Sequence, residues 1–136
     1  MWKATVLTLF PEMFPGTLRH SLAGKALDAG IWSLNKVNIR DFSGDKNGKV
    51  DDVPFGGGNG MVIKADVLNE ALKSVSDAPG PRIYLSPRGK NFDQKLAKKL
   101  SFGNGAVFIC GRYEGVDERF LVYNEIEEVS LGDFIL

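Results

Sequence analysis

Three glycine-bearing loops follow three apolar stretches of the sequence, and together they could bind a ligand through backbone groups. They are Ser-Pro-Arg-Gly at 86–89, Gly-Arg-Tyr-Glu-Gly at 111–115 and Gly-Asp at 132–133. Glycine lets a backbone approach a ligand closely. In open α/β sheets, ligands bind in the crevice beyond the carboxyl ends of the strands. The pattern predicts a site able to read an adenine ring, although each loop taken singly could be a plain turn.

Two other groups of residues could bind phosphate or act in catalysis, but the residues around them in the sequence do not support either role. The Gly56–Gly60 run is followed by no Lys-Ser/Thr pair and preceded by no strand, so a flexible substrate-facing loop fits it better than a phosphate cradle. Cys110 ends an apolar strand, where a free cysteine usually packs as a small hydrophobe. His20 has no carboxylate near it in sequence that would make it a base for Cys110. With one cysteine and one histidine, we assign no metal-binding residues and expect no internal disulfide.

Strands that alternate with helices are expected to position these loops. This rhythm predicts an α/β fold with a mainly parallel sheet flanked by helices. A polar, glycine-rich connection at 40–60 interrupts the rhythm, and connections of that length are often functional or mobile. The strands are expected at 4–10, 31–39, 82–85, 106–110 and 126–131, and the helices at 18–29, 67–75, 92–100 and 116–123.

Length and charge set the broad class. The 136 residues suit a single domain, and 17 basic residues balance 17 acidic ones. There is no overall basic field, which weighs mildly against RNA binding by this segment alone. No stretch has the pattern of a signal sequence or the length of a membrane span, so we predict a cytoplasmic protein with no membrane partner. The apolar end, Phe134-Ile135-Leu136, is expected either to be cut within a larger structure or to form a buried edge strand.

Five ordered motifs make the sequence more specific. Together they resemble the bacterial tRNA (guanine-N1-)-methyltransferases of the SPOUT class, over the whole chain. The stretch at 110–119 is the most specific of them. The motifs are Leu-Phe-Pro-Glu-Met-Phe at 9–14, Val-Pro-Phe-Gly-Gly-Gly-Asn-Gly-Met at 53–61, Ile-Tyr-Leu-Ser-Pro-Arg-Gly at 83–89, Cys-Gly-Arg-Tyr-Glu-Gly-Val-Asp-Glu-Arg at 110–119 and Ser-Leu-Gly-Asp-Phe-Ile-Leu at 130–136.

The resemblance implies a deep trefoil knot, which bottom-up reasoning would not propose because knots are essentially absent from proteins. It implies that residues 1–136 form an S-adenosyl-L-methionine-binding domain that is incomplete at its C-terminus. Glu114 could then favour the positive sulfonium or orient the guanine, or be a surface or helix-capping residue. The implied cofactor-binding residues are Tyr84, Leu85, Ser86, Pro87, Gly111, Glu114, Leu131, Gly132, Asp133, Phe134, Ile135 and Leu136.

The resemblance also implies partners and a reaction. The partners are tRNA and a second copy of the chain, in a homodimer with its active site between subunits. The methyl group goes to N1 of the guanine just 3′ of the anticodon, and the family suggests a need for Mg²⁺. The general base and a helical tRNA-binding domain are expected beyond Leu136, so residues 1–136 alone are expected to be inactive.

Asn59 replaces the family's usual proline and should loosen the glycine-rich loop. Two alternatives stay open: a non-catalytic RNA-binding or dimerisation module, and a nucleotide-binding regulatory α/β domain.

Overall fold

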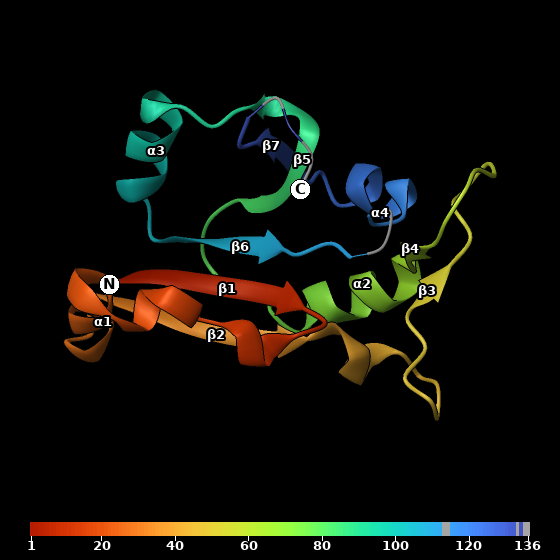
Figure 1. Ribbon diagram of the computed structural model, residues 1–136, viewed down its shortest axis with the longest axis horizontal. Coiled ribbons are helices and arrows are strands. Elements are labelled where there is room, and N and C mark those ends of the chain that lie inside the picture. Colours follow the sequence, from red (N-terminus) through yellow and green to blue (C-terminus); the bar gives the residue numbers. More distant parts are fainter. Residues whose placement is uncertain (113–114, 133, 135–136) are drawn as a thin grey trace.

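The main sheet has five parallel strands in the order β2-β1-β6-β5-β7 (Figure 1). The computed structural model describes residues 1–112, 115–132 and 134. A second, two-stranded antiparallel sheet pairs β3 with β4. The α/β class with a mainly parallel sheet is therefore confirmed. The strands are β1 (Trp2–Thr8), β2 (Trp32–Asn38), β3 (Asp51–Asp52), β4 (Val62–Ile63), β5 (Arg82–Asn91), β6 (Gly105–Ile109) and β7 (Glu127–Ser130).

Of the four α-helices in the described residues, two have a side-chain cap at the N-terminus. The Asp93 carboxylate accepts a hydrogen bond from the Leu96 N–H at 2.8 Å, and the Asp117 carboxylate accepts one from the Arg119 N–H at 2.9 Å. Such caps satisfy N–H groups that have no partner within the helix. The α-helices are α1 (Ser21–Asp28), α2 (Ala65–Lys73), α3 (Gln94–Ser101) and α4 (Glu118–Tyr123), and the 3-10 segments are η1 (Pro11–Met13), η2 (Gly16–Arg19) and η3 (Ile39–Phe42).

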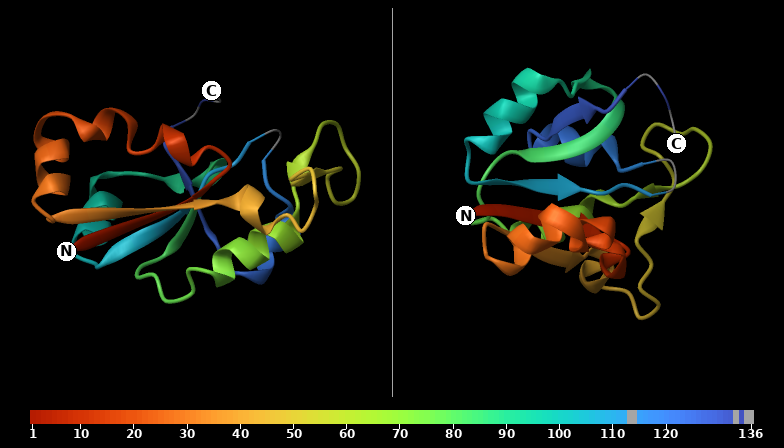
Figure 2. Two further views of the ribbon diagram at one scale, coloured as in Figure 1. Left: turned by 90° about the horizontal axis from the view of Figure 1, so that it is seen from below. Right: turned by 60° about the vertical axis from the view of Figure 1, so that its left-hand side comes forward.

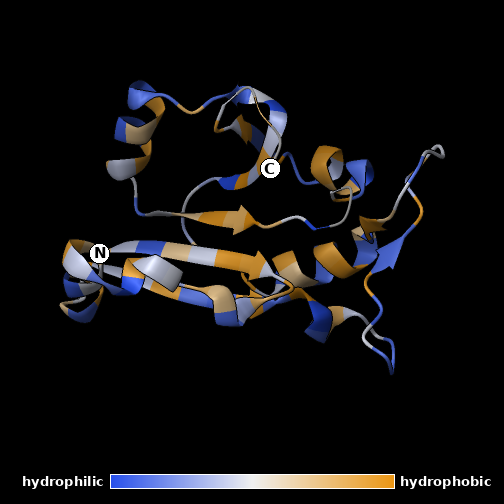
Figure 3. Ribbon diagram, viewed as in Figure 1, coloured by the Kyte–Doolittle hydropathy of each residue, from blue (hydrophilic) through white to orange (hydrophobic). Residues whose placement is uncertain are grey.

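The hydrophobic core has two parts, one on each face of the sheet. On one face, Leu7 and Val107 pack in a cluster with Leu68 of α2 and Phe120 of α4, and all four are fully buried. On the other face, Ala106 packs in a smaller cluster with residues of α3. Alternation along β6, which Figure 3 colours as mainly hydrophobic, sends successive side chains to opposite faces. Figure 2 shows α2 and α4 together on one side of the sheet, away from α3.

Strand β5 is longer than the sequence predicts. We expected a loop at 86–89, but β5 continues to Asn91, and both Leu85 and Lys90 pair with Val129 of β7. The prediction of a loop there was wrong. Residues 86–89 form an irregular excursion within β5, and the pairs on either side of it hold the strand against β7. A Cβ at Gly89 would lie 2.4 Å from the Glu128 carbonyl carbon, so only glycine permits this approach.

The connection at 40–60 includes regular elements and a buried residue, although its composition is polar and glycine-rich. It contains η3 and β3, and its Val50 side chain is fully buried in the main core. Beyond β3 the glycine-rich segment, defined here as residues 53–60, projects away from the main sheet before β4 returns (Figure 1). Most other boundaries differ from the predicted ones by one to three residues; α1 begins at Ser21, after η2, and α4 begins at Glu118. Before α1, propensity could not distinguish the 3-10 turn η2 from the first turn of a helix, whereas before α4 Val116 forms a β-bridge with Ile63.

Candidate cofactor pocket

A cavity of about 210 Å³ lies where β5 and β7 approach the edge of the sheet. Six of its lining residues are ones that the sequence pointed to, and the structure brings them together. Its walls are mostly apolar, with the Ser86 side chain buried among them. The residues are Leu85, Ser86 and Pro87 from β5, and Leu131, Gly132 and Phe134 after β7, joined by Ser130.

Ser130 is the lining residue that sequence reasoning missed. Its hydroxyl donates to the Gly132 carbonyl at 2.9 Å and accepts from the Gly132 N–H at 3.2 Å. A serine two residues before the turn glycine is the signal that could have found it, because serine hydroxyls often close such turns. Phe134 lies close to the same turn, since a Cβ on Gly132 would be 2.4 Å from the Phe134 Cε1 atom. Ser130 therefore shapes the wall that Gly132 and Phe134 present.

The 111–115 loop meets β5 at Tyr84. A Cβ on Gly111 would lie 3.0 Å from the Tyr84 Cε1 and Oη atoms, and a Cβ on Gly115 would lie 2.8 Å from Oη. Burial raises the pKa of the Tyr84 hydroxyl, which therefore stays protonated at neutral pH. Gly111 lies against the Tyr84 ring and does not line the cavity itself. Glu114, Asp133, Ile135 and Leu136, which the sequence also pointed to, lie outside the described residues.

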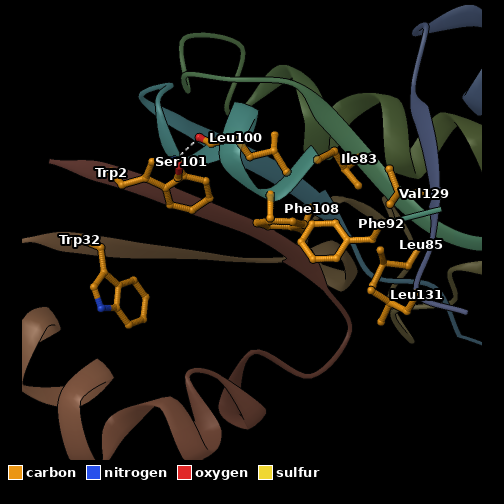
Figure 4. Close-up of a pocket in the computed structure, with 11 residues that line it drawn as sticks. Trp2, Trp32, Ile83, Leu85, Phe92, Leu100, Ser101, Phe108, Val129 and Leu131 are labelled. Atoms are coloured by element: carbon orange, nitrogen blue, oxygen red, sulfur yellow. Dashed lines mark hydrogen bonds between the residues drawn. The ribbon is translucent and has the colours of Figure 1, made fainter. Parts of the chain in front are cut away.

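A larger groove of about 550 Å³ lies on the other side of Leu85 and Leu131, which belong to both hollows. Figure 4 shows its apolar side chains, with Trp2 and Trp32 at one end and Leu85 and Leu131 at the other. Its polar side-chain groups are already engaged: the Trp2 Nε1–H donates to the Leu100 carbonyl, and the Ser101 hydroxyl donates to the Lys98 carbonyl. The smaller cavity is the better candidate, because it is lined by residues at the carboxyl ends of β7 and of the paired part of β5, where ligands bind in open α/β sheets.

The comparison with known proteins shows the family of this chain. The family model for tRNA (guanine-1)-methyltransferase TrmD matches residues 2–136. The chain belongs to this family. It is 56% identical to the tRNA (guanine-N(1)-)-methyltransferase of Bartonella bacilliformis and 54% identical to that of Agrobacterium fabrum, over 99% of its own length in each case. It covers 58% and 59% of the lengths of those two relatives, so it spans less than two thirds of each.

Ion pairs join the elements around the TrmD-family pocket. The Arg88 guanidinium contacts both Glu118 of α4 and Glu128 of β7, which ties the excursion of β5 to its neighbours. The Arg119 side chain pairs with the buried Asp117 carboxylate and holds the pKa of that carboxyl below its usual range. Arg112 lies 4.8 Å from the centroid of the Phe10 ring and so connects the 111–115 loop to the end of β1.

The remaining candidate groups of this TrmD-family chain do not form a reactive set in the described residues. Burial raises the pKa of the Cys110 thiol to about 11, so the thiolate is scarce at neutral pH. His20 is exposed at the N-cap of α1, and no described hydrogen bond joins it to Cys110. Among residues 1–112, 115–132 and 134, no three His, Cys, Asp or Glu side chains gather as a metal site. No helix in this part of the chain is long and apolar enough to cross a membrane.

Proposed function

We propose that the whole protein transfers a methyl group from S-adenosyl-L-methionine to N1 of the guanine just 3′ of the anticodon in tRNA. In this reaction the S–CH₃ bond breaks and an N1–CH₃ bond forms. The N1 proton passes to a base, and S-adenosylhomocysteine leaves. Membership of the TrmD family supports this function, together with the names of the relatives. The observation that carries the proposal within this chain is the cavity between β5 and β7.

The cavity suits the adenosine part of the methyl donor. Apolar side chains on several sides offer flat contacts to an adenine ring. We assign the adenosine to Leu85, Ser86, Pro87, Leu131, Gly132 and Phe134. Tyr84 and Gly111 then position the 111–115 loop beside it, and Glu114, Asp133, Ile135 and Leu136 are proposed to complete the pocket.

Methyl transfer requires alignment of the methyl group with the guanine nitrogen and removal of the N1 proton. The described residues supply part of the alignment. We propose that the general base and the main tRNA-binding surface lie beyond Leu136, as the family resemblance implies. The described carboxylates do not gather into a site for Mg²⁺, so we assign no residue of this chain to that ion. The SPOUT knot, a homodimer with a shared active site and a cytoplasmic location complete the proposal.

Mass spectrometry of the nucleosides from a methylated tRNA tests this function. The whole protein should form N1-methylguanosine in a tRNA with guanine 3′ of the anticodon, and none in a matched tRNA with adenine there. Residues 1–136 alone should bind S-adenosylhomocysteine but give only background transfer. Absence of N1-methylguanosine with the whole protein would refute the proposal. Robust transfer by residues 1–136 would instead place the base within this chain.

A further inference from the structure

Arg119, at the start of α4, contacts two parts of the chain that are more than sixty residues apart in sequence. Its Nε and Nη2 atoms donate to the two carboxylate oxygens of Asp117, at 3.0 and 2.7 Å. Its Cζ atom also lies 4.5 Å from the centroid of the Phe55 ring. A planar guanidinium can use its edge for a carboxylate and its face for a ring at the same time. Arg119 therefore joins the glycine-rich segment to the end of the 111–115 loop.

The backbone makes a second connection between the same two regions. The Ile63 N–H donates to the Gly115 carbonyl at 3.0 Å, and the Asp117 N–H donates to the Ile63 carbonyl at 3.0 Å. Ile63 belongs to β4, which follows the glycine-rich segment, and residues 115–117 lie at the end of the 111–115 loop. These bonds hold only the C-terminal end of the segment, whereas Phe55 lies near its N-terminal end.

The glycine-rich segment has few other means of holding its shape. Gly56, Gly57, Gly58 and Gly60 all have positive φ values, and the Phe55 side chain is 66% exposed. The described backbone hydrogen bonds of 53–60 are local, such as that from the Gly57 N–H to the Pro54 carbonyl at 3.1 Å. Glycines carry a large conformational entropy, so a single side-chain contact has a large influence on where such a segment lies.

Direct binding of an RNA phosphate is a weaker role for Arg119. The guanidinium edge is occupied by Asp117, whose side chain is 4% exposed. Arg119 also borders a polar hollow of about 420 Å³ that holds more carboxylates than cations. A polyanion is disfavoured there by charge repulsion. The charged residues of this hollow are Asp52, Lys64, Asp66, Asp117 and Arg119.

We propose that Arg119 is a positioning residue that fastens the glycine-rich segment, through Phe55, to Asp117 at the end of the 111–115 loop. The segment then presents a defined surface to the RNA, and the position of residues 115–117 is transmitted to it. This role rests on the proposed function for its RNA substrate, but the contact between Arg119 and Phe55 can be tested without any activity.

Hydrogen exchange measured by mass spectrometry tests the fastening directly. Phe55→Leu keeps an apolar side chain and removes the ring, whereas Arg119→Gln removes the cation. In both variants the amides of 53–62 should exchange about threefold faster, which corresponds to a cation–π contact at an exposed site. S-adenosylhomocysteine should slow exchange at 53–62 in the wild-type protein and much less in the variants. Phe55→Tyr should restore the wild-type pattern.

Steady-state kinetics of the whole protein tests the consequence for RNA. Phe55→Leu and Arg119→Gln should raise the KM for tRNA by about threefold, the same factor as the exchange, while the Kd for S-adenosylhomocysteine changes by less than about twofold. Arg119→Lys should recover part of the loss, because its ammonium can still lie over Phe55. Lys95→Gln, which removes an exposed cation of α3, is the control and should behave as wild type. The double variant should be no worse than the worse single variant.

Arg119→Gln leaves Asp117 buried without its cation and could destabilise α4, so Phe55→Leu decides the outcome. Unchanged exchange at 53–62 in Phe55→Leu would overturn the fastening. Effects of Phe55→Leu and Arg119→Gln that multiply in the double variant would also overturn it, because they would be independent. If the wild-type protein does not methylate tRNA, the proposed function fails and the exchange experiment still tests the contact.

Discussion

The contact between Gly115 and Tyr84 gives a prediction whose size follows from the structure. Gly115 has a φ of +121°, and a Cβ there would lie 2.8 Å from the Tyr84 Oη atom. Apart from Gly115 itself and the residues next to it in the chain, no other heavy atom of the described residues comes within 4 Å of that position. A side chain at this φ costs about 1–3 kcal/mol in backbone strain. The close contact adds about 1 kcal/mol, the lower end of what overpacking costs. Gly115→Ala should therefore lower the free energy of unfolding by about 2–4 kcal/mol.

Removing the Tyr84 hydroxyl separates the two contributions. In a Tyr84→Phe background the contact is gone and the strain persists, so Gly115→Ala should cost about 1 kcal/mol less than in wild type. Gly58→Ala is the matched control, because Gly58 has a φ of +117° and its nearest neighbour is 4.0 Å away. Its cost should be the same in both backgrounds.

Urea unfolding of wild type and the variants provides the four free energies of the cycle. An equal cost of Gly115→Ala in the wild-type and Tyr84→Phe backgrounds would refute the reasoning, because the hydroxyl would then not be the obstacle. A loss below about 1 kcal/mol in both backgrounds would mean that the loop relaxes freely around the new methyl group. In either case, Tyr84 would not position the 111–115 loop through this contact.

Three further predictions concern single groups. The pKa of Asp117 is lowered chiefly by the hydrogen bonds from Arg119, so its stabilising contribution is present above about pH 4 and is lost as pH falls through its lower folded-state value. Urea midpoints of Asp117→Asn and wild type should therefore converge on acidification, and a constant difference between pH 7 and pH 2 would contradict this. The Cys110 thiol, with its pKa raised to about 11 by burial, should react slowly with iodoacetamide at pH 8, and rapid alkylation of the folded protein would contradict its burial. Gly132→Ala should displace the Phe134 ring and weaken the binding of S-adenosylhomocysteine about tenfold. The loss of stability should be small, because Phe134 is 53% exposed. Calorimetry that found unchanged affinity would remove Phe134 from the pocket wall.

Short-range patterns predicted the elements whose burial is decided locally. Five consecutive apolar residues at 106–110 predicted β6, which the structure places at Gly105–Ile109. Apolar spacing predicted a helix at 67–75, and α2 runs from Ala65 to Lys73 with Val67, Leu68 and Ala71 buried. Of the three glycine-bearing stretches that predicted a hollow beyond the strand ends, Ser86, Pro87 and Gly132 line one, whereas Gly111 lies against Tyr84 and outside it.

Features that depend on partners distant in sequence could not be predicted. Residues 86–89 have the composition of a loop, and they belong to β5 because Leu85 and Lys90, on either side of them, both pair with Val129 of β7, about forty residues later. Val50 is surrounded by polar residues in sequence, yet it is fully buried in the main core. The contact between Phe55 and Arg119 has no signal in the spacing of the residues, because it depends on how β4 lies against residues 115–117.

A crystal structure of the protein with S-adenosylhomocysteine tests the central claim most directly. We expect density for the adenosine between Leu85–Pro87 on one side and Leu131, Gly132 and Phe134 on the other, with Tyr84 and Gly111 in their present contact. Adenosine bound in the groove beside Trp2 and Trp32, or anywhere away from the ends of β5 and β7, would contradict the claim.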